Sequence, residues 1–399
     1  MPRKISAHYV FPISSAPIKN GIIELDDNGT ILNIIDPGKE LKEIAGLEFY
    51  SGILVPGFVN THCHIELSHL KGRFAEHTGL PVFISQISKA RVADENIILK
   101  AIKKADLEMQ NNGIVAVGDI SNTEYSFFAK KHSKIKYHTF VEVLSVSPEN
   151  AMAAFKSCKN LENKFSDIGL SASLAPHAPY SLSKKLFRLF NEETKKNKKT
   201  VSMHNQETAS ENELFINKSG DIFDSIKNMI GVDFSHFKPT GQNSLESVSH
   251  SFPKENKCLL VHNTFSKEND IVTANGCFNK LYWVFCPNAN LYIENKLPDI
   301  PLFYKLKQKC TIGTDSLASN HKLSVLDELK TIHAHFPELP MWELLKWASL
   351  NGAEALQLSD KMGSFEIGKQ PGVNLISNID FNKMLLIPES KVKVLVDRT

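Results

Sequence analysis

The chain has 399 residues, of which 42% are hydrophobic and 23% are charged. It is too long for one minimal domain, and its composition suits a large folded core. The formal net charge of +2 gives no general attraction to nucleic acid or to an anionic membrane surface. The six cysteines contain no Cys-x-x-Cys pair, which favours reduced thiols in a cytoplasmic protein over a disulfide framework. We also expect no signal peptide and no membrane-spanning segment.

Both ends of the chain have the pattern of short strands separated by turns. The clearest turn is Asp27-Asn28-Gly29, and a second turn with a short strand spans residues 363–368. We therefore predict a small β-sandwich domain built from residues 1–52 and 360–399. Its expected strands are Ser6–Ile13, Gly21–Asp26, Ile31–Ile35, Val373–Ser377 and Val392–Val396.

The middle of the chain, residues 53–359, alternates apolar strand-like runs with amphipathic stretches. Eight such units predict an α/β fold, the (β/α)8 TIM barrel, in which catalytic groups lie at the carboxyl ends of the strands. The polar segment 234–249 is predicted to be a loop over the active site. The eight expected strands are Ile53–Val59, Ile114–Val117, Tyr137–Leu144, Gly169–Leu174, Thr200–Met203, Cys258–Val261, Leu281–Phe285 and Cys310–Ile312.

Polar side chains follow several of these strands at the point where each strand ends. The first strand ends in a His-x-His pair, and because side chains alternate along a strand, both imidazoles lie on one face. Three neutral imidazoles and one carboxylate are a ligand set for a divalent ion that keeps a position open for water. Residues of these types at the strand ends are His62, His64, His177, His204, Glu207, His262 and Asp315.

Such an ion would lower the pKa of its water from about 16 to about 7, so that hydroxide forms at neutral pH. A second carboxylate near the site can carry a proton to the leaving group. We predict one divalent metal ion, with zinc as the first choice and ferrous iron as the alternative. Glu142 and Asp119 also end strands, and either can line the pocket or hydrogen-bond the metal ligands.

Five motifs in order resemble the amidohydrolase superfamily, in particular its cytosine deaminase-like branch, which includes guanine deaminase, S-adenosylhomocysteine deaminase and the triazine hydrolases. They are Pro-Gly-Phe-Val-Asn-Thr-His-x-His, Ala-Pro-His-Ala-Pro-Tyr-Ser, His-x-x-Glu, the histidine of the sixth strand and Gly-Thr-Asp-Ser, and they span residues 55–316. The strand-rich ends also resemble the small β domain of this family. The resemblance therefore covers nearly the whole chain.

The resemblance implies a role for each matched residue. His62, His64, His204 and Asp315 would bind the metal, and Asp315 would also accept a proton from the attacking water. No lysine lies between residues 169 and 183 to form the carbamate bridge of the binuclear members, which favours a mononuclear site.

The remaining matched residues would act on the substrate. Glu207 would pass the proton to a ring nitrogen, His262 would polarise the attacked centre or hold the hydroxide, and His177 would contact the substrate. A narrower similarity to aminofutalosine deaminase-like members rests on Glu66 and Asn320, which are predicted to bind substrate.

The sequence thus predicts a cytoplasmic hydrolase that removes an exocyclic amino group from a small N-heterocycle, such as the adenine of aminofutalosine or a related nucleoside. The alternative is hydrolysis of a ring amide or a C–Cl bond, as in imidazolonepropionase-like and triazine hydrolase-like members. Glu207 favours deamination, because that reaction needs a proton donor to the ring. A non-catalytic scaffold would be expected to lack Glu207, His262 or Asp315. The H-x-E…P-C-x-x-C pattern of polynucleotide deaminases is absent. A homodimer is left open.

Overall fold

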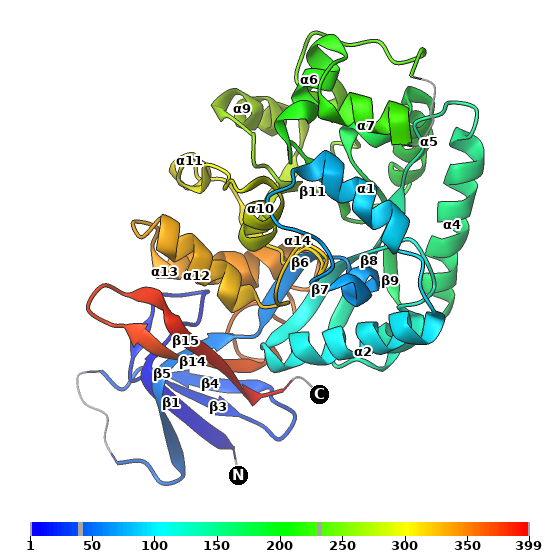
Figure 1. Cartoon of the computed structure of the whole chain (residues 1–399). Coiled ribbons are helices and arrows are strands. Elements are labelled where there is room, and N and C mark those ends of the chain that lie inside the picture. The colour runs from blue at the N-terminus through cyan, green and yellow to red at the C-terminus, as the bar shows by residue number, and fades with distance from the viewer. Residues whose placement is uncertain (1, 39–42, 230–233, 398–399) are drawn as a thin grey trace.

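The computed structural model describes residues 2–38, 43–229 and 234–397. A barrel of parallel strands with helices around it occupies one end of the molecule. At the other end, strands from both termini lie side by side in a separate sheet (Figure 1). In the part of the chain that the structure describes, no helix is both long enough and apolar enough to cross a membrane.

The terminal sheet contains seven strands in the order β15-β14-β5-β1-β3-β4, with β2 paired to β1. The hydrophobic cluster of this sheet includes Ile5, Leu54 and Val373, with Phe365 from the segment before β14 packed among them. The hydrogen bonds join these strands into one sheet, whereas the prediction was a sandwich. The strands are β1 (Arg3–Val10), β2 (Ile18–Lys19), β3 (Ile22–Leu25), β4 (Ile31–Ile35), β5 (Leu47–Pro56), β14 (Val373–Asp380) and β15 (Leu385–Val396).

The predicted first strand of the barrel is divided between the two sheets. Its first half belongs to β5, which pairs with β14 of the terminal sheet, and its second half begins β6 (Phe58–Cys63). Between them, a side chain on Gly57 would meet Val115 Cγ1 at 2.3 Å and Pro371 O at 2.6 Å, so only glycine fits. The domain boundary predicted at residue 53 therefore falls inside β5.

Eight parallel strands form the barrel as two four-stranded sheets, β6-β7-β8-β9 and β10-β11-β12-β13. The two sheets meet along two seams. At the seam between β6 and β13, Cys63 and Asp315 form an isolated β-bridge. At the seam between β9 and β10, the amide of His204 donates to the carbonyl of His177 (2.9 Å). Polar residues of the predicted site therefore lie at both seams. The other strands are β7 (Ile114–Ser121), β8 (Lys136–Val143), β9 (Ser171–Pro176), β10 (Val201–Asn205), β11 (Lys257–His262), β12 (Lys280–Phe285) and β13 (Cys310–Ile312).

Most of the helices surround the barrel, and the longer ones bury an apolar face. In α2 (Glu95–Asn111), for example, Ile98, Ile102 and Met109 are buried, and the Asp94 side chain caps the first turn. The others are α3 (Phe127–His132), α4 (Ala151–Asp167), α5 (Lys184–Thr194), α6 (Ala209–Asn217), α8 (Ser244–Ser249), α9 (Glu268–Cys277), α10 (Pro287–Glu294), α11 (Ile300–Lys305), α12 (Val325–His335), α13 (Met341–Lys346) and α14 (Gly352–Ala355).

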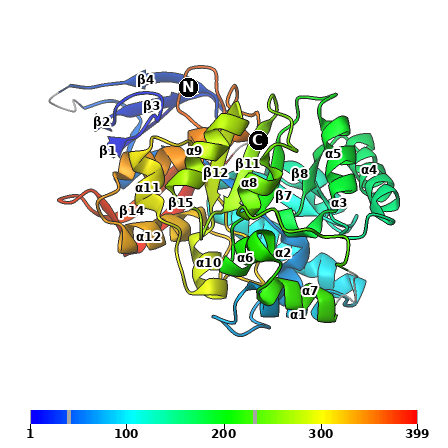
Figure 2. The same cartoon turned by 90° about the horizontal axis from the view of Figure 1, so that it is seen from above.

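Two helices differ from this arrangement because they cover the carboxyl ends of the strands. They are α1 (Leu80–Ala90) and α7 (Asp221–Met229), which pack against each other (Figure 2). They belong to the connections after β6 and β10, where the loops that carry the site of a (β/α) barrel are found.

Candidate active site

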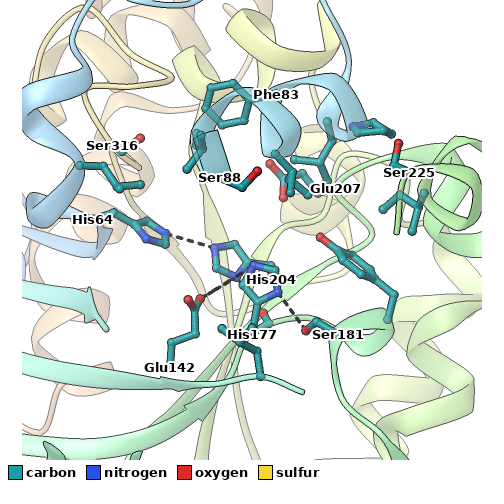
Figure 3. Close-up of a pocket in the computed structure, with 18 of the residues that line it drawn as sticks. His64, Phe83, Ser88, Glu142, His177, Ser181, His204, Glu207, Ser225 and Ser316 are labelled. Carbon is teal, nitrogen blue, oxygen red and sulfur yellow. Dashed lines mark hydrogen bonds and ion pairs between the residues drawn. The ribbon is translucent and has the colours of Figure 1, made fainter. Parts of the chain in front are cut away.

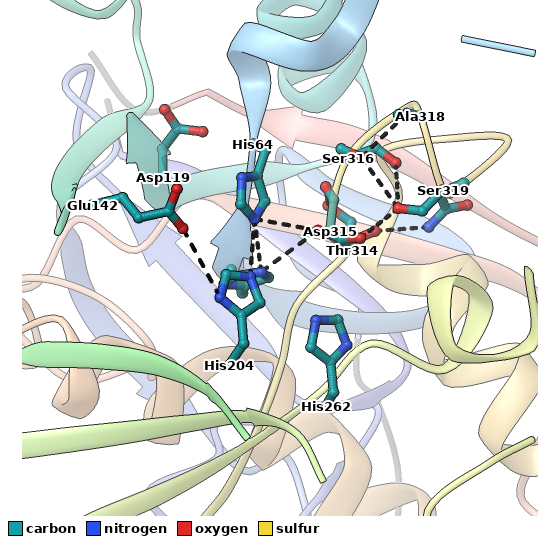
Figure 4. Close-up of polar contacts among 12 residues, drawn as sticks. His64, Asp119, Glu142, His204, His262, Thr314, Asp315, Ser316, Ala318 and Ser319 are labelled. Atoms are coloured by element: carbon teal, nitrogen blue, oxygen red, sulfur yellow. Dashed lines mark hydrogen bonds and ion pairs between the residues drawn. The ribbon is translucent and has the colours of Figure 1, made fainter. Parts of the chain in front are cut away.

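The His-x-His pair lies at the seam where β6 meets the end of β13. His62 and His64 point to the same side of β6, while Cys63 is turned away and fully buried. Asp315 Oδ1 lies 3.5 Å from the Nε2 atoms of both histidines (Figure 4). His204, at the end of β10, completes the cluster, because its Nε2 is 3.2 Å from His64 Nε2.

The three Nε2 atoms converge in a way that fits a shared cation. His64 Nε2 is 3.2 Å from both His62 Nε2 and His204 Nε2. Tetrahedral zinc with bonds of 2.0–2.1 Å places neighbouring nitrogens roughly 3.4 Å apart. Burial lowers the pKa of His64, and burial together with the neighbouring imidazoles lowers that of His204. Both rings are therefore neutral, as metal ligands must be, and the residues present fit a divalent ion.

The loop that carries Asp315 is fixed directly against β6. The amides of Thr314 and Asp315 donate to the carbonyl of His62 (3.0 and 3.1 Å), and Asn60 Nδ2 donates to Thr314 Oγ1 (2.8 Å). Gly313 permits this approach, since a Cβ there would lie 2.7 Å from His62 Cβ. Asp315 itself has a φ of +55°, a strained conformation typical of functional sites.

Burial by itself would raise the pKa of Asp315, but the hydrogen bond from His62 and the nearby imidazoles lower it. The Ser319 hydroxyl donates to Asp315 Oδ2 and holds the carboxylate in place. Asp315 is therefore an ionised carboxylate beside two imidazoles.

The segment after β10 positions Glu207. Gln206 has a φ of +45°, and the buried carboxylate of Glu211, at the start of α6, accepts hydrogen bonds from the amides of Gln206 (3.1 Å) and Glu207 (3.4 Å). Glu207 Oε1 lies 3.5 Å from His262 Nε2. Burial, followed by the charge of Asp315, raises the pKa of Glu207 well above its ordinary value. The environment of Glu207 therefore favours its protonated form.

His262 ends β11 with a φ of +73° and is almost completely buried. Burial lowers its pKa to about 3, so its imidazole is neutral. His262 contacts Glu207 and lies beside His62 and His204, with ring centroids 5.6 and 5.5 Å away. It is therefore between the predicted metal ligands and the predicted acid.

A cavity of about 290 Å³ opens over this cluster (Figure 3). His64, His177, His204, Glu207, His262 and Asp315 form its polar end. The rest is largely apolar, and α1 contributes much of that surface through Leu80, Phe83, Ile84 and Ile87. Such a cavity, apolar with a few convergent polar groups, is typical of a small-molecule site.

Two predicted substrate contacts lie elsewhere among the described residues. The Glu66 carboxylate accepts from the Asn122 amide (3.1 Å) and the Ser126 hydroxyl (3.3 Å), and Asn320 donates to Thr314 O and Glu328. Neither Glu66 nor Asn320 lines the cavity. Their substrate contact stays a prediction, and the observed role of both side chains is to fix loops.

The cover of the cavity also differs from the expectation. The described segment 234–249 does not line it, whereas α1 and, through Ile222 and Ser225, α7 do. Glu142 at the end of β8 does line it, one of the two roles that the sequence left open for that residue.

A buried ion pair supports the strand that carries the His-x-His pair. Lys130 Nζ lies 2.7 Å from Asp119 Oδ2, and both side chains are fully buried. Asp119 Oδ1 accepts from the amide of Ile65 (2.8 Å), the residue after His64. Asp119 therefore fixes the backbone next to His64. It does not line the cavity, and its hydrogen bond goes to Ile65 rather than to a predicted metal ligand. Lys130 was not recognised from the sequence, because it lies in α3, eleven residues after Asp119.

The barrel and the residues at its strand ends define an enzyme of the (β/α) barrel class with a candidate metal centre. The family model described as "Amidohydrolase family" matches residues 53–392, so the chain belongs to the amidohydrolase family. The resemblance predicted from the sequence motifs is thereby confirmed. The protein is a hydrolase whose family and relatives support action on carbon–nitrogen bonds.

Three similar proteins illustrate the relationship. The chain is 29% identical over 346 residues to an adenosine deaminase from Helicobacter pylori, covering 84% of this chain and 81% of that protein. It is similar to the structure of Helicobacter pylori aminofutalosine deaminase in complex with methylthio-coformycin, with a TM-score of 0.80, 24% identity and coverage of 96% and 94%. A Xanthomonas campestris adenosine deaminase with bound zinc matches with a TM-score of 0.73, 21% identity and coverage of 99% and 93%.

Proposed function

We propose that this protein is a metal-dependent aminohydrolase that replaces the exocyclic amino group of an adenine nucleoside with oxygen and releases ammonia. The observation that carries the proposal is the polar end of one cavity, where three converging imidazoles meet the Asp315 carboxylate and the buried carboxyl group of Glu207. Hydrolytic deamination needs an activated water that attacks the ring carbon and an acid that protonates the ring. The site provides residues for both.

His62, His64, His204 and Asp315 would hold one divalent ion. When bound, the ion supplies a water of lowered pKa and polarises the attacked carbon. Zinc is our first choice, because three imidazoles and a carboxylate are ligands that it accepts readily. Ferrous iron suits the same ligand set and is the alternative. The bound zinc in the Xanthomonas campestris relative supports the first choice.

The protein's own groups account for the proton transfers. The Asp315 carboxylate, ionised and held by Ser319, accepts the proton of the attacking water. The buried Glu207 carboxyl donates a proton from Oε1 or Oε2 to a ring nitrogen, and burial favours its protonated form. Asp315 then passes the proton it accepted to the departing amino group, which leaves as ammonia, and the hydroxyl on the attacked carbon returns a proton to Glu207. His262, neutral and 3.5 Å from Glu207, orients this carboxyl group and stabilises the charge it gains.

The shape of the cavity supports a nucleoside rather than a small base. Its apolar part, lined by α1 and α7, extends from the polar end and offers room for a sugar and a substituent. Relatives that are named adenosine deaminase and aminofutalosine deaminase support adenine as the base. Aminofutalosine is the particular substrate that we put forward.

The chain organisation is also part of this proposal. We assign residues 53–359 to the hydrolase barrel and residues 1–52 with 360–399 to a small β domain that supports it. Residues of β5 and β14 pair across this division, which favours two domains that fold together. A cytoplasmic location and a homodimer complete the proposal.

The experiment is an ammonia-release assay with zinc-loaded protein. The panel contains adenosine, aminofutalosine, S-adenosylhomocysteine, guanine, cytosine and a chloro-triazine. We expect turnover of the adenine nucleosides, fastest with aminofutalosine. Release of chloride from the triazine, or turnover of guanine or cytosine alone, would contradict the proposal.

A further inference from the structure

Glu142 carries an unused hydrogen-bond acceptor that faces the cavity. Its side chain is only 7% exposed, and Asn122 Nδ2 donates to Oε2 (2.9 Å). Oε1 has no hydrogen-bond partner among the described residues, although Glu142 lines the cavity. A buried carboxylate oxygen without a donor is costly, and such a group calls for a partner.

His177 lies beside this carboxylate. The Ser181 hydroxyl donates its own proton to the carbonyl of Ala178 (2.9 Å), so His177 Nδ1 must donate to Ser181 Oγ (2.9 Å). Nε2, the other nitrogen of this ring, lies 3.9 Å from Glu142 Oε1. Figure 3 shows the two side chains together below His204. Because no described residue donates to Glu142 Oε1, a molecule in the cavity is the donor that this oxygen calls for.

The position of Glu142 and His177 restricts which ligand group can donate to Glu142 Oε1. Glu142 Oε1 lies 4.0 Å from His204 Nδ1, the ring nitrogen that points away from the cluster of Nε2 atoms. The reacting amino group belongs at that cluster and beside Glu207. In an adenine nucleoside the amino group and the sugar hydroxyls are the only hydrogen-bond donors, so Glu142 Oε1 is left for the sugar.

We infer that Glu142, with His177, is the ribose-binding subsite of this enzyme and accepts hydrogen bonds from the 2′- and 3′-hydroxyl groups. The inference rests on the proposed function and adds a specificity for ribonucleosides. Glu66 supports the subsite indirectly. It binds the amide of Asn122, whose side chain holds Glu142 in position.

The test compares adenosine with 2′,3′-dideoxyadenosine in the parent protein, in Glu142→Ala and in Glu142→Gln. A hydrogen bond to a charged group predicts that Glu142→Ala lowers kcat/KM for adenosine by about 10- to 100-fold. For the dideoxy compound the loss should be less than about threefold, because the interacting hydroxyls are absent. Glu142→Gln, which keeps an acceptor, should lose less than Glu142→Ala.

The matched control is Glu149→Ala, an exposed glutamate on the loop after β8, which should leave both substrates unchanged. Zinc content is measured for every variant, since a merely structural role of Glu142 would lower metal binding and affect both substrates equally. An equal loss on the two nucleosides with zinc retained overturns the inference.

Calorimetric binding of inosine and 2′,3′-dideoxyinosine separates this inference from the proposed function. If the parent protein deaminates neither adenine nucleoside but binds inosine in a Glu142-dependent way, the reaction is wrong and the subsite stands. If deamination occurs and Glu142→Ala does not distinguish the sugars, the reaction stands and the subsite is wrong. Absence of both turnover and binding removes both.

Discussion

Replacing Glu207 by glutamine removes the proton donor while preserving the shape of the side chain. General acid–base catalysis contributes about 10²- to 10⁴-fold to a rate. Among the described residues that line the cavity, the other carboxylates are Glu142 and Asp315, and neither contacts His262 as Glu207 does. Because no second acid can take over, we expect the upper part of this range. The predicted loss in kcat is about 10³- to 10⁴-fold, or roughly 4–5 kcal/mol in the barrier.

The assay measures kcat for adenosine together with zinc per chain. Zinc content should be unchanged, because Glu207 lies outside the cluster of three imidazoles and Asp315. Glu213→Gln, an exposed glutamate in α6, is the matched control and should retain parental activity. A Glu207→Gln variant within threefold of the parent would refute the assigned proton transfer. Loss of zinc would instead give Glu207 a role in metal binding.

Three other predictions concern the support of the site. Lys130→Met leaves the buried Asp119 carboxylate unpaired and should lower the free energy of unfolding by about 3–5 kcal/mol in urea denaturation, with a loss under 1 kcal/mol counting against it. Gly313→Ala brings a Cβ against His62 and should destabilise the fold by about 1–3 kcal/mol and weaken zinc binding in a chelator competition, so parental zinc affinity would disprove the steric argument. Burial raises the pKa of Glu328 to about 8, so the folded state binds more protons than the unfolded state between pH 4.5 and 8. The free energy of unfolding therefore falls as pH rises through this range. Glu328→Gln should flatten this pH dependence, and an unchanged slope would contradict the argument.

The sequence predicted much of the barrel, because each strand is a short apolar run between polar segments. It also predicted which polar residues lie together, since His62, His64, His204, Glu207 and Asp315 directly follow such runs and the topology brings strand ends together. Their catalytic and metal-binding roles stay predictions. The start of the first strand was misplaced. Residues 53–59 are apolar throughout, so hydropathy cannot show that the chain changes sheets at Gly57, where close packing forces the bend.

Features that depend on side-chain pairing were not predictable from the sequence. Glu66 follows the metal motif closely, but its carboxylate is occupied by the Asn122 amide and the Ser126 hydroxyl, which lie in the connection after β7. Glu142 gained its significance only from an oxygen left without a partner, which no sequence pattern reveals. The cover of the cavity was misplaced for a similar reason, because α1 contains ordinary helix-packing residues such as Leu80 and Phe83.

The central claim is that this chain deaminates an adenine nucleoside with one divalent ion held by His62, His64, His204 and Asp315. The most direct measurement is ammonia and inosine formation from adenosine by protein of known zinc content, before and after removal of the metal by a chelator. We predict about one zinc per chain, equal amounts of ammonia and inosine, loss of activity on chelation and recovery with added zinc. Unchanged turnover by metal-free protein, or no ammonia from any adenine nucleoside with the metal bound, would contradict the claim.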